Sequence, residues 1–344
     1  MNSTGLPDDG YGFGYFEHAG RSFTAVCLPD GALLELPFND PRAIFDDWET
    51  AHRVIADTAE RANGSALTFA QVRPLPPVDR PNIHGAASNF RRHVAEMMHK
   101  TGSGRRANED DEARLARAKT MMARREDTEP FFFQGNWSAI SGAEDEIVLH
   151  PHGFRHDWEL ELGAVIGRSE RHVHPDRGEP LIAGYTICND LGTLDLAFRT
   201  SAGPFTTDFA DKFEPTFKPT GPFIVPRELV DLDRLRIVLK KNGEVMQDEG
   251  LDDMVFRPGY LAAYASSRFR LVPGDLIICG SPAGNAAQHG GAWLQAGDLV
   301  ESELTFLGRQ RNRCVDETLT DEQRAVAARV FQRIWDFRPA DPPV

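Results

Sequence analysis

Residues 154–167 read Phe-Arg-His-Asp-Trp-Glu-Leu-Glu-Leu-Gly-Ala-Val-Ile-Gly, and from Trp158 onward apolar and acidic side chains alternate. Because successive side chains of a β-strand point to opposite faces, the alternation predicts a strand with Glu159 and Glu161 on one face. Two carboxylates roughly 6.5–7 Å apart along a strand repel each other unless a cation lies between them. The hard ions Mg²⁺, Mn²⁺ and Ca²⁺ prefer such oxygen ligands. The alternative is an ordinary one-sided strand with two solvated acids.

The composition is that of an ordinary globular protein. The chain has 344 residues, of which 41% are hydrophobic and 26% charged, enough for one large domain with a smaller one, or for two domains. The net charge of −14 argues against a nucleic-acid or anionic membrane surface. No apolar run approaches the roughly 18 residues of a membrane span. The four cysteines form no C-x-x-C pair, and residues 1–10 lack an apolar signal-peptide core, so we expect a cytoplasmic protein with reduced thiols.

The order of patterns predicts three regions. Residues 1–78 combine short strands with one helical stretch at 41–62 and end in a proline-rich linker, which predicts a small N-terminal α/β domain. Residues 79–316 are mostly short strands with turns, which predicts a β-rich catalytic domain. Within it, residues 97–128 form a charged helical insertion that is either a lid or a merely solvated helix. Residues 317–344 predict a C-terminal helix and tail that pack on the body or on a second subunit.

Two further segments carry candidate catalytic groups. His93 and Glu96 are spaced i and i+3, so a helix places them on one face, where a carboxylate can orient an imidazole as a general base. A solvated helical turn is the alternative. Asp190 ends the apolar segment that begins at Leu181, a position from which ligands often project, although a turn or N-cap residue is also common there. Neither pattern is specific alone.

Taken in order, these segments resemble the fumarylacetoacetate hydrolase family over about residues 80–315. The segments that carry the resemblance are Asn89–Glu96, Asp157–Gly167, Gly184–Asp190, Phe217–Pro222, Asn242–Gln247, Pro273–Gly284 and Gly297–Gly308. The resemblance implies an α+β, β-rich fold: a mixed β-roll catalytic domain with a small N-terminal α/β domain and a C-terminal helix. It also implies a homodimer.

The resemblance assigns roles to matching positions in this sequence. It implies that Glu159, Glu161 and Asp190 bind Mg²⁺, with Mn²⁺ or Ca²⁺ possible. It implies that His93 and Glu96 activate water and that Lys212 supplies positive charge near metal and substrate. We count four further positions as substrate contacts: Asn89, Arg91, Gln134 and Ser281.

The implied reaction is hydrolysis of a carbon–carbon bond in a 2,4-dioxo acid, such as an acylpyruvate. A metal chelated by the keto and carboxylate oxygens would act as a Lewis acid and stabilise an enolate, while His93 takes a proton from water. The alternatives are a decarboxylase or isomerase of a 2-oxo or 2-hydroxy-dienoate from aromatic catabolism, and a non-catalytic binding protein that keeps the fold. The partner is a small oxo acid in the first two cases.

Several positions depart from the family pattern. Leu194 stands where arginine is common, Pro215 where an acid is common, and Gln134 where many relatives carry lysine. Ser281 replaces a frequent threonine, although its hydroxyl can still bind a carboxylate. The metal and dyad positions are therefore kept, whereas the positions that choose the substrate differ.

Overall fold

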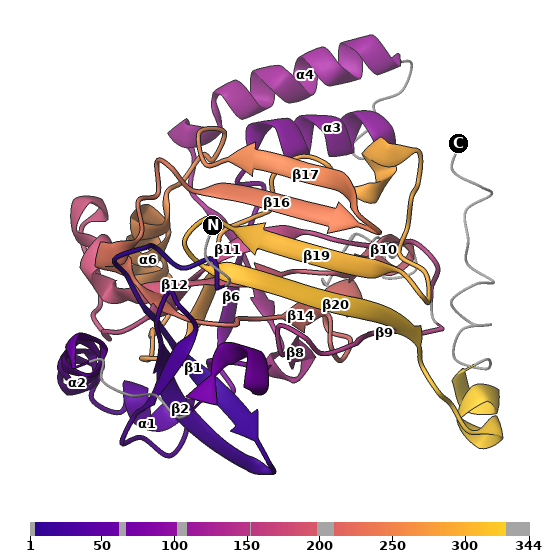
Figure 1. The fold of residues 1–344 in the computed structure, drawn as a ribbon. Coiled ribbons are helices and arrows are strands. Elements are labelled where there is room, and N and C mark those ends of the chain that lie inside the picture. Colours follow the sequence, from indigo (N-terminus) through magenta and orange to yellow (C-terminus); the bar gives the residue numbers. More distant parts are fainter. Residues whose placement is uncertain (1–3, 62–66, 102–108, 152, 198–209, 328–344) are drawn as a thin grey trace.

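A computed structural model describes residues 4–61, 67–101, 109–151, 153–197 and 210–327. Figure 1 shows a small N-terminal sheet with its helices beside a larger β-rich body. The mixed α+β, β-rich architecture that the sequence predicts is confirmed.

The N-terminal unit is an antiparallel sheet in the order β4-β3-β2-β1-β5 with two helices beside it. Its elements are β1 (Gly12–His18), β2 (Arg21–Cys27), β3 (Ala32–Glu35), α1 (Pro41–Phe45), α2 (Trp48–Glu60), β4 (Leu67–Thr68) and β5 (Arg73–Leu75). The single helix expected at 41–62 is two helices, because Asp47 accepts a hydrogen bond from the backbone of Thr50 and starts α2 anew. The expected linker begins with β5, which pairs with β1.

The body contains two mixed sheets. The first has the order β15-β12-β11-β18-β6-β7 and the second β17-β16-β19-β20-β9. Their strands are β6 (Ile83–Ala87), β7 (Phe131–Gly135), β9 (Ile147–Leu149), β11 (Leu160–Ile166), β12 (Ile182–Asn189), β15 (Val225–Pro226), β16 (Arg236–Lys241), β17 (Glu244–Gly250), β18 (Leu276–Ile278), β19 (Leu299–Leu304) and β20 (Gly308–Asp316). Only β18–β6 and β20–β9 pair in parallel within these sheets.

Short pairs and helices complete the body. The short strands are β8 (Ile140–Ser141) with β14 (Lys218–Pro219), and β10 (His156–Asp157) with β13 (Gly192–Thr193). The α-helices are α3 (Arg91–Thr101), α4 (Asp111–Ala123), α5 (Leu194–Ala197) and α6 (Pro258–Arg268). Among the described residues, the 3₁₀ helices are η1 (Phe69–Gln71), η2 (Arg125–Asp127), η3 (Trp137–Ala139), η4 (Pro175–Arg177), η5 (Glu179–Leu181), η7 (Ala210–Lys212), η8 (Arg227–Leu229) and η9 (Ala286–His289).

Strand β11 lies in the core, not on the surface. Every residue of β11 and β12 is buried. The second sheet lies across them in Figure 1, and β16 and β20 contact β11 and β12, respectively. The strand begins at Leu160, so Glu159 directly precedes it. An acid on this strand therefore cannot be a solvated edge residue, which removes the ordinary interpretation of Glu161.

Of two further predictions from the sequence, one is confirmed and the other falls only partly within the described residues. The Asn242-Gly243 turn joins β16 to β17 with φ of 53° and 83°, as that dipeptide predicts. Of the predicted C-terminal helix, residues 321–327 are helical and the remainder lies outside the described residues. Across the part of the chain that the structure describes, no helix combines the length and apolar character needed to cross a membrane.

Candidate metal centre

Three carboxylates converge where β11 begins and β12 ends. The two strands are antiparallel with Leu160 opposite Asn189, and the N–H of Asp190 donates to the carbonyl of Glu159 at 2.8 Å. One carboxylate oxygen each from Glu159, Glu161 and Asp190 lies within 4.8 Å of the others. The structure thus brings together the three residues that the sequence singled out.

The loop after β18 supports the cluster. The N–H of Gly280 donates to Oε2 of Glu161 at 2.6 Å, and the side-chain oxygen of Asn189 accepts from the N–H of Glu159 at 3.0 Å. Gly280 has φ of 92°, and a Cβ there would lie 2.9 Å from both the carbonyl oxygen of Ala86 and the Cβ of Asn89. Glycine is required at this position for both reasons.

The electrostatics of the cluster fit a hard cation. Burial raises the pKa of Glu161 well above its usual range, and the neighbouring charges of Asp190 and Glu159 add to that effect. A divalent ion would remove this penalty, because it favours the ionised form of all three acids. The donor set consists only of carboxylate oxygens, which is the chemistry that Mg²⁺, Mn²⁺ and Ca²⁺ prefer. The residues present therefore fit a divalent metal without selecting one.

Two buried lysines pair with acids of the cluster. Lys212 Nζ lies 2.8 Å from Glu159 Oε2, from Asp190 Oδ2 and from the carbonyl of Asp190. Lys218 pairs with the other oxygen of the Asp190 carboxylate, Oδ1. Burial alone would raise the pKa of Asp190, but the two ammonium groups outweigh it and hold that pKa below its ordinary value. The sequence-based prediction included Lys212 but not Lys218.

His93 and Glu96 both lie on α3, as their spacing predicts, but they do not hydrogen-bond. Among the described residues, neither Nδ1 of His93 nor Oε2 of Glu96 has a hydrogen-bond partner. Burial lowers the pKa of His93, against the opposing influence of Glu159 and of a contact with Asn285. Burial raises the pKa of Glu96. A neutral imidazole near the acid cluster is therefore available to accept a proton.

The four expected substrate contacts have different surroundings. Asn89 donates to the carbonyls of Phe256 and Cys279 at 3.0 and 2.7 Å and accepts from the N–H of Phe256, so a substrate contact would require breaking these bonds. Arg91 donates to the carbonyls of Asp253 and Met254 and pairs with Glu126 at 2.9 Å. Both side chains thus support the fold.

The remaining two positions differ in exposure. Gln134 is exposed on the edge strand β7, opposite His84. Ser281 is buried, and its Oγ accepts a hydrogen bond from Nε2 of Gln247 at 3.0 Å and donates to the carbonyl of Pro282. Of the four, Ser281 follows Gly280 directly and is therefore next to the group that binds Glu161.

Three buried residues around the site were not singled out from sequence. Gln247 ties the Ser281 loop to β11, because its Oε1 also accepts from the N–H of Leu160. Asn285 donates to the carbonyl of Trp158 at 2.9 Å and contacts His93. Burial raises the pKa of Asp157 to about 7. The N-G-x-x-x-Q segment carried a signal for Gln247; buried polar side chains in loops, such as Asn285, carry none.

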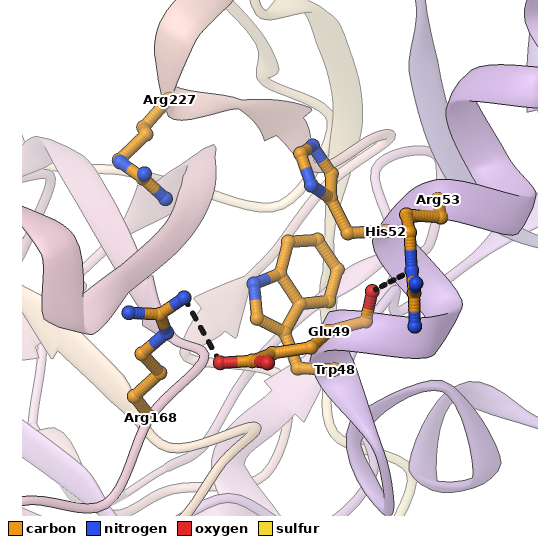
Figure 2. A pocket seen from close by; sticks show the side chains of 6 residues that line it. All are labelled: Trp48, Glu49, His52, Arg53, Arg168 and Arg227. Carbon is orange, nitrogen blue, oxygen red and sulfur yellow. Dashed lines mark hydrogen bonds and ion pairs between the residues drawn. The ribbon is translucent and has the colours of Figure 1, made fainter.

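A separate surface cavity lies at the other end of β11. The cavity has a volume of about 310 Å³. Figure 2 shows the side chains that line it, Trp48, Glu49, His52, Arg53, Arg168 and Arg227. Its cations have partners: Arg168 pairs with Glu49 at 3.0 Å, and Arg227 donates to the carbonyl of Ile182. The seven residues of β11 separate this cavity from the acid cluster by roughly 20 Å. The acid cluster, and not this cavity, is the candidate site.

Comparison with known proteins agrees with this architecture. The family model described as fumarylacetoacetate (FAA) hydrolase C-terminal matches residues 82–315, about two thirds of the chain. The protein therefore belongs to the fumarylacetoacetate hydrolase family, whose members are generally dependent on a divalent metal.

Two curated relatives show how the family varies. The chain is 36% identical over 190 residues to a 2,4-didehydro-3-deoxy-L-rhamnonate hydrolase from a Sphingomonas strain, covering 54% of this chain and 65% of that protein. It is 34% identical over 189 residues to the mitochondrial oxaloacetate tautomerase FAHD2B of Homo sapiens, covering 54% and 59%. The matched regions span less than two thirds of either relative. The family thus includes hydrolases and tautomerases.

Solved structures share the fold over most of the chain. The fumarylacetoacetate hydrolase of Exiguobacterium antarcticum has a TM-score of 0.68 and 22% identity, covering 89% of this chain and all of its own. The 5-carboxymethyl-2-hydroxymuconate delta-isomerase of Mycobacterium smegmatis has a TM-score of 0.64 and 23% identity, covering 90% of this chain and 100% of its own. At these identities the likeness establishes the fold alone.

Proposed function

We propose that this protein is a divalent-metal-dependent hydrolase that cleaves a carbon–carbon bond in a 2,4-dioxo acid of the acylpyruvate class. The observation that supports this most is the cluster of Glu159, Glu161 and Asp190 beside a helix that carries a neutral imidazole. The relative named 2,4-didehydro-3-deoxy-L-rhamnonate hydrolase is consistent with it.

Each residue of the site would have a role that follows from its position. Glu159, Glu161 and Asp190 would hold the metal, which would supply Lewis acidity towards the oxygens of the bound oxo acid. The ammonium of Lys212, already 2.8 Å from Glu159, adds positive charge where negative charge develops on the substrate. The hydroxyl of Ser281 would donate to a substrate carboxylate in place of the carbonyl of Pro282, its present acceptor.

Helix α3 carries the residues that would activate water. His93 accepts a proton from water, and the resulting hydroxide attacks the distal carbonyl of the substrate. Glu96 would orient the imidazole through Nδ1 once the two side chains meet. Their missing hydrogen bond is compatible with this role, because catalytic hydrogen bonds are often long in the absence of substrate.

That missing hydrogen bond also supports a second candidate, a tautomerase, isomerase or decarboxylase of a 2-oxo acid. Such reactions need the metal cluster and a proton-transfer group but no activated water. The relative named oxaloacetate tautomerase is consistent with this candidate.

One experiment separates these candidates. The purified protein, loaded with Mg²⁺ or Mn²⁺, is incubated with acylpyruvates, dienoate oxo acids and oxaloacetate, and products are identified by mass. Hydrolysis adds the mass of water and gives two acids, decarboxylation loses CO₂, and tautomerisation changes absorbance without a change in mass. Glu159→Gln serves as the inactive control. Turnover without any hydrolytic product would overturn the hydrolase proposal. A homodimeric assembly stays a prediction that light scattering would test.

A further inference from the structure

Lys218 is a wholly buried lysine built into the interior of the body. It lies on β14, with no exposed surface, and among the described residues its ammonium pairs with one acid, Asp190, which is equally buried. The side chain passes Gly135 on β7: a Cβ at that glycine would lie 3.2 Å from Cε of Lys218. Its Nζ lies 6.0 Å from the centroid of the Phe133 ring. Packing against Gly135 and Phe133 thus fixes the course of the Lys218 side chain through the interior.

The two lysines at Asp190 contact different oxygens. Lys218 pairs with Oδ1, whereas Lys212 lies 2.8 Å from Oδ2 and bridges to Glu159. Lys212 therefore lies among the acids that would hold the metal, and an incoming ion would compete with it for Oδ2. Lys218 contacts Asp190 alone among the acids of the cluster.

We propose that Lys218 is a permanent internal cation of the metal centre: it fixes the Asp190 carboxylate through Oδ1 and lowers the affinity of the cluster for a divalent ion. This inference rests on the proposed metal role of Glu159, Glu161 and Asp190. It assigns Lys218 as a positioning residue, because it acts through Asp190 and has no exposed surface of its own.

Two physical effects have the same sign. A fixed positive charge in a low-dielectric interior repels a nearby divalent cation much more strongly than the same charge would in water. Without metal, the lysine also compensates the buried Asp190 carboxylate, so it stabilises the metal-free state that competes with binding. Both effects weaken metal binding, so a higher free metal concentration is needed to fill the site.

The test is metal binding in the Lys218→Met variant, which keeps the aliphatic stem and removes the charge. Mn²⁺ affinity is measured by titration calorimetry on the full chain. We expect the variant to bind Mn²⁺ at least tenfold more tightly, about 1.4 kcal/mol, than the unmodified protein. Its metal-free form should melt at a lower temperature, and Mn²⁺ should raise its melting temperature by more than that of the unmodified protein.

Controls separate this inference from the proposed function. Lys240→Met removes an exposed lysine on β16 and should leave Mn²⁺ affinity within about twofold. If Lys218→Met does not fold without metal, Lys218→Gln keeps a donor for Asp190 and should still bind Mn²⁺ more tightly. Equal or weaker binding in the folded variant overturns the inference. No Mn²⁺ binding in the unmodified protein overturns the metal site itself.

Discussion

The N–H of Asp190 donates to the carbonyl of Glu159 at 2.8 Å, so the residue that follows β12 lies directly beside the residue that precedes β11. This backbone bond sets the geometry of the candidate metal centre, because it brings a third carboxylate to Glu159 and Glu161, at the start of β11. The predictions below test that centre and the residues that support it.

Glu159→Gln should abolish tight metal binding while leaving the protein folded. The glutamine amide oxygen can still accept a hydrogen bond from Lys212, but it carries no charge for a divalent ion. We expect Mn²⁺ affinity to fall by at least roughly 100-fold, at or beyond the upper end of the 10–100-fold loss seen when only a supporting partner of a ligand is removed. Glu170→Gln, an exposed position, is the matched control. Full turnover in a metal-stripped Glu159→Gln protein would contradict the metal role.

Asp190→Asn should destabilise the metal-free protein by about 3–5 kcal/mol, because it leaves two buried ammonium groups with less compensating charge. Urea unfolding measures the loss. Combining Asp190→Asn with Lys218→Met removes one of those uncompensated charges, so the double variant should be more stable than the sum of the single changes predicts. Strict additivity would show that Asp190 and Lys218 do not interact.

His93→Gln should remove hydrolysis while changing Mn²⁺ affinity by less than about threefold, because His93 is outside the carboxylate cluster. In the unmodified protein, burial lowers the pKa of His93, and the neutral form is the base. We therefore expect kcat/KM to rise with pH through a midpoint below about 6.5, the ordinary histidine value. Unchanged turnover of an acylpyruvate by His93→Gln would refute the water-activating role.

Asp157→Asn should change how stability depends on pH. Burial raises the pKa of Asp157 to about 7, so between about pH 4 and 7 the folded state holds a proton that the unfolded state has lost. This group therefore costs stability as pH rises through that window. The asparagine oxygen can still accept from the N–H groups of Trp158 and Ala286. The stability loss between pH 5 and 8 should shrink by about 1–4 kcal/mol, measured by urea unfolding of metal-free protein. An identical pH profile in the variant would contradict this assignment.

Replacing residues 102–124 with a short Gly-Ser segment should reduce turnover more than stability. Helix α4 buries Ala118 and Met122 and packs against α3, the helix that carries His93. Loss of that packing should lower kcat at least tenfold, because α3 would be mispositioned. The melting temperature should fall by only about 2–4 °C for each kcal/mol lost from the free energy of unfolding. Unaffected kcat and KM would show that the insertion neither closes over nor supports the site.

Much of the fold and site could be predicted because the signals are local. The Asn242-Gly243 hairpin and the pair of acids around Leu160 depend on strand periodicity and turn chemistry. The burial of β11 on both faces could not be predicted, since alternating polar residues usually indicate a half-exposed strand. Likewise, the single helix expected at 41–62 is interrupted by a new N-cap at Asp47, which periodicity does not reveal.

The sequence by itself determined which acids, and in which order, could form a metal site, because Glu159 and Glu161 lie two positions apart in an alternating segment and Asp190 ends the apolar segment that begins at Leu181. Only the tertiary structure decided what surrounds them. Lys218 sits between Phe217 and Pro219 with no periodic or motif signal, yet its ammonium reaches Asp190 across the interior. Contacts between residues far apart in the chain depend on strand register and side-chain packing, and these are set by the whole core rather than by local pattern.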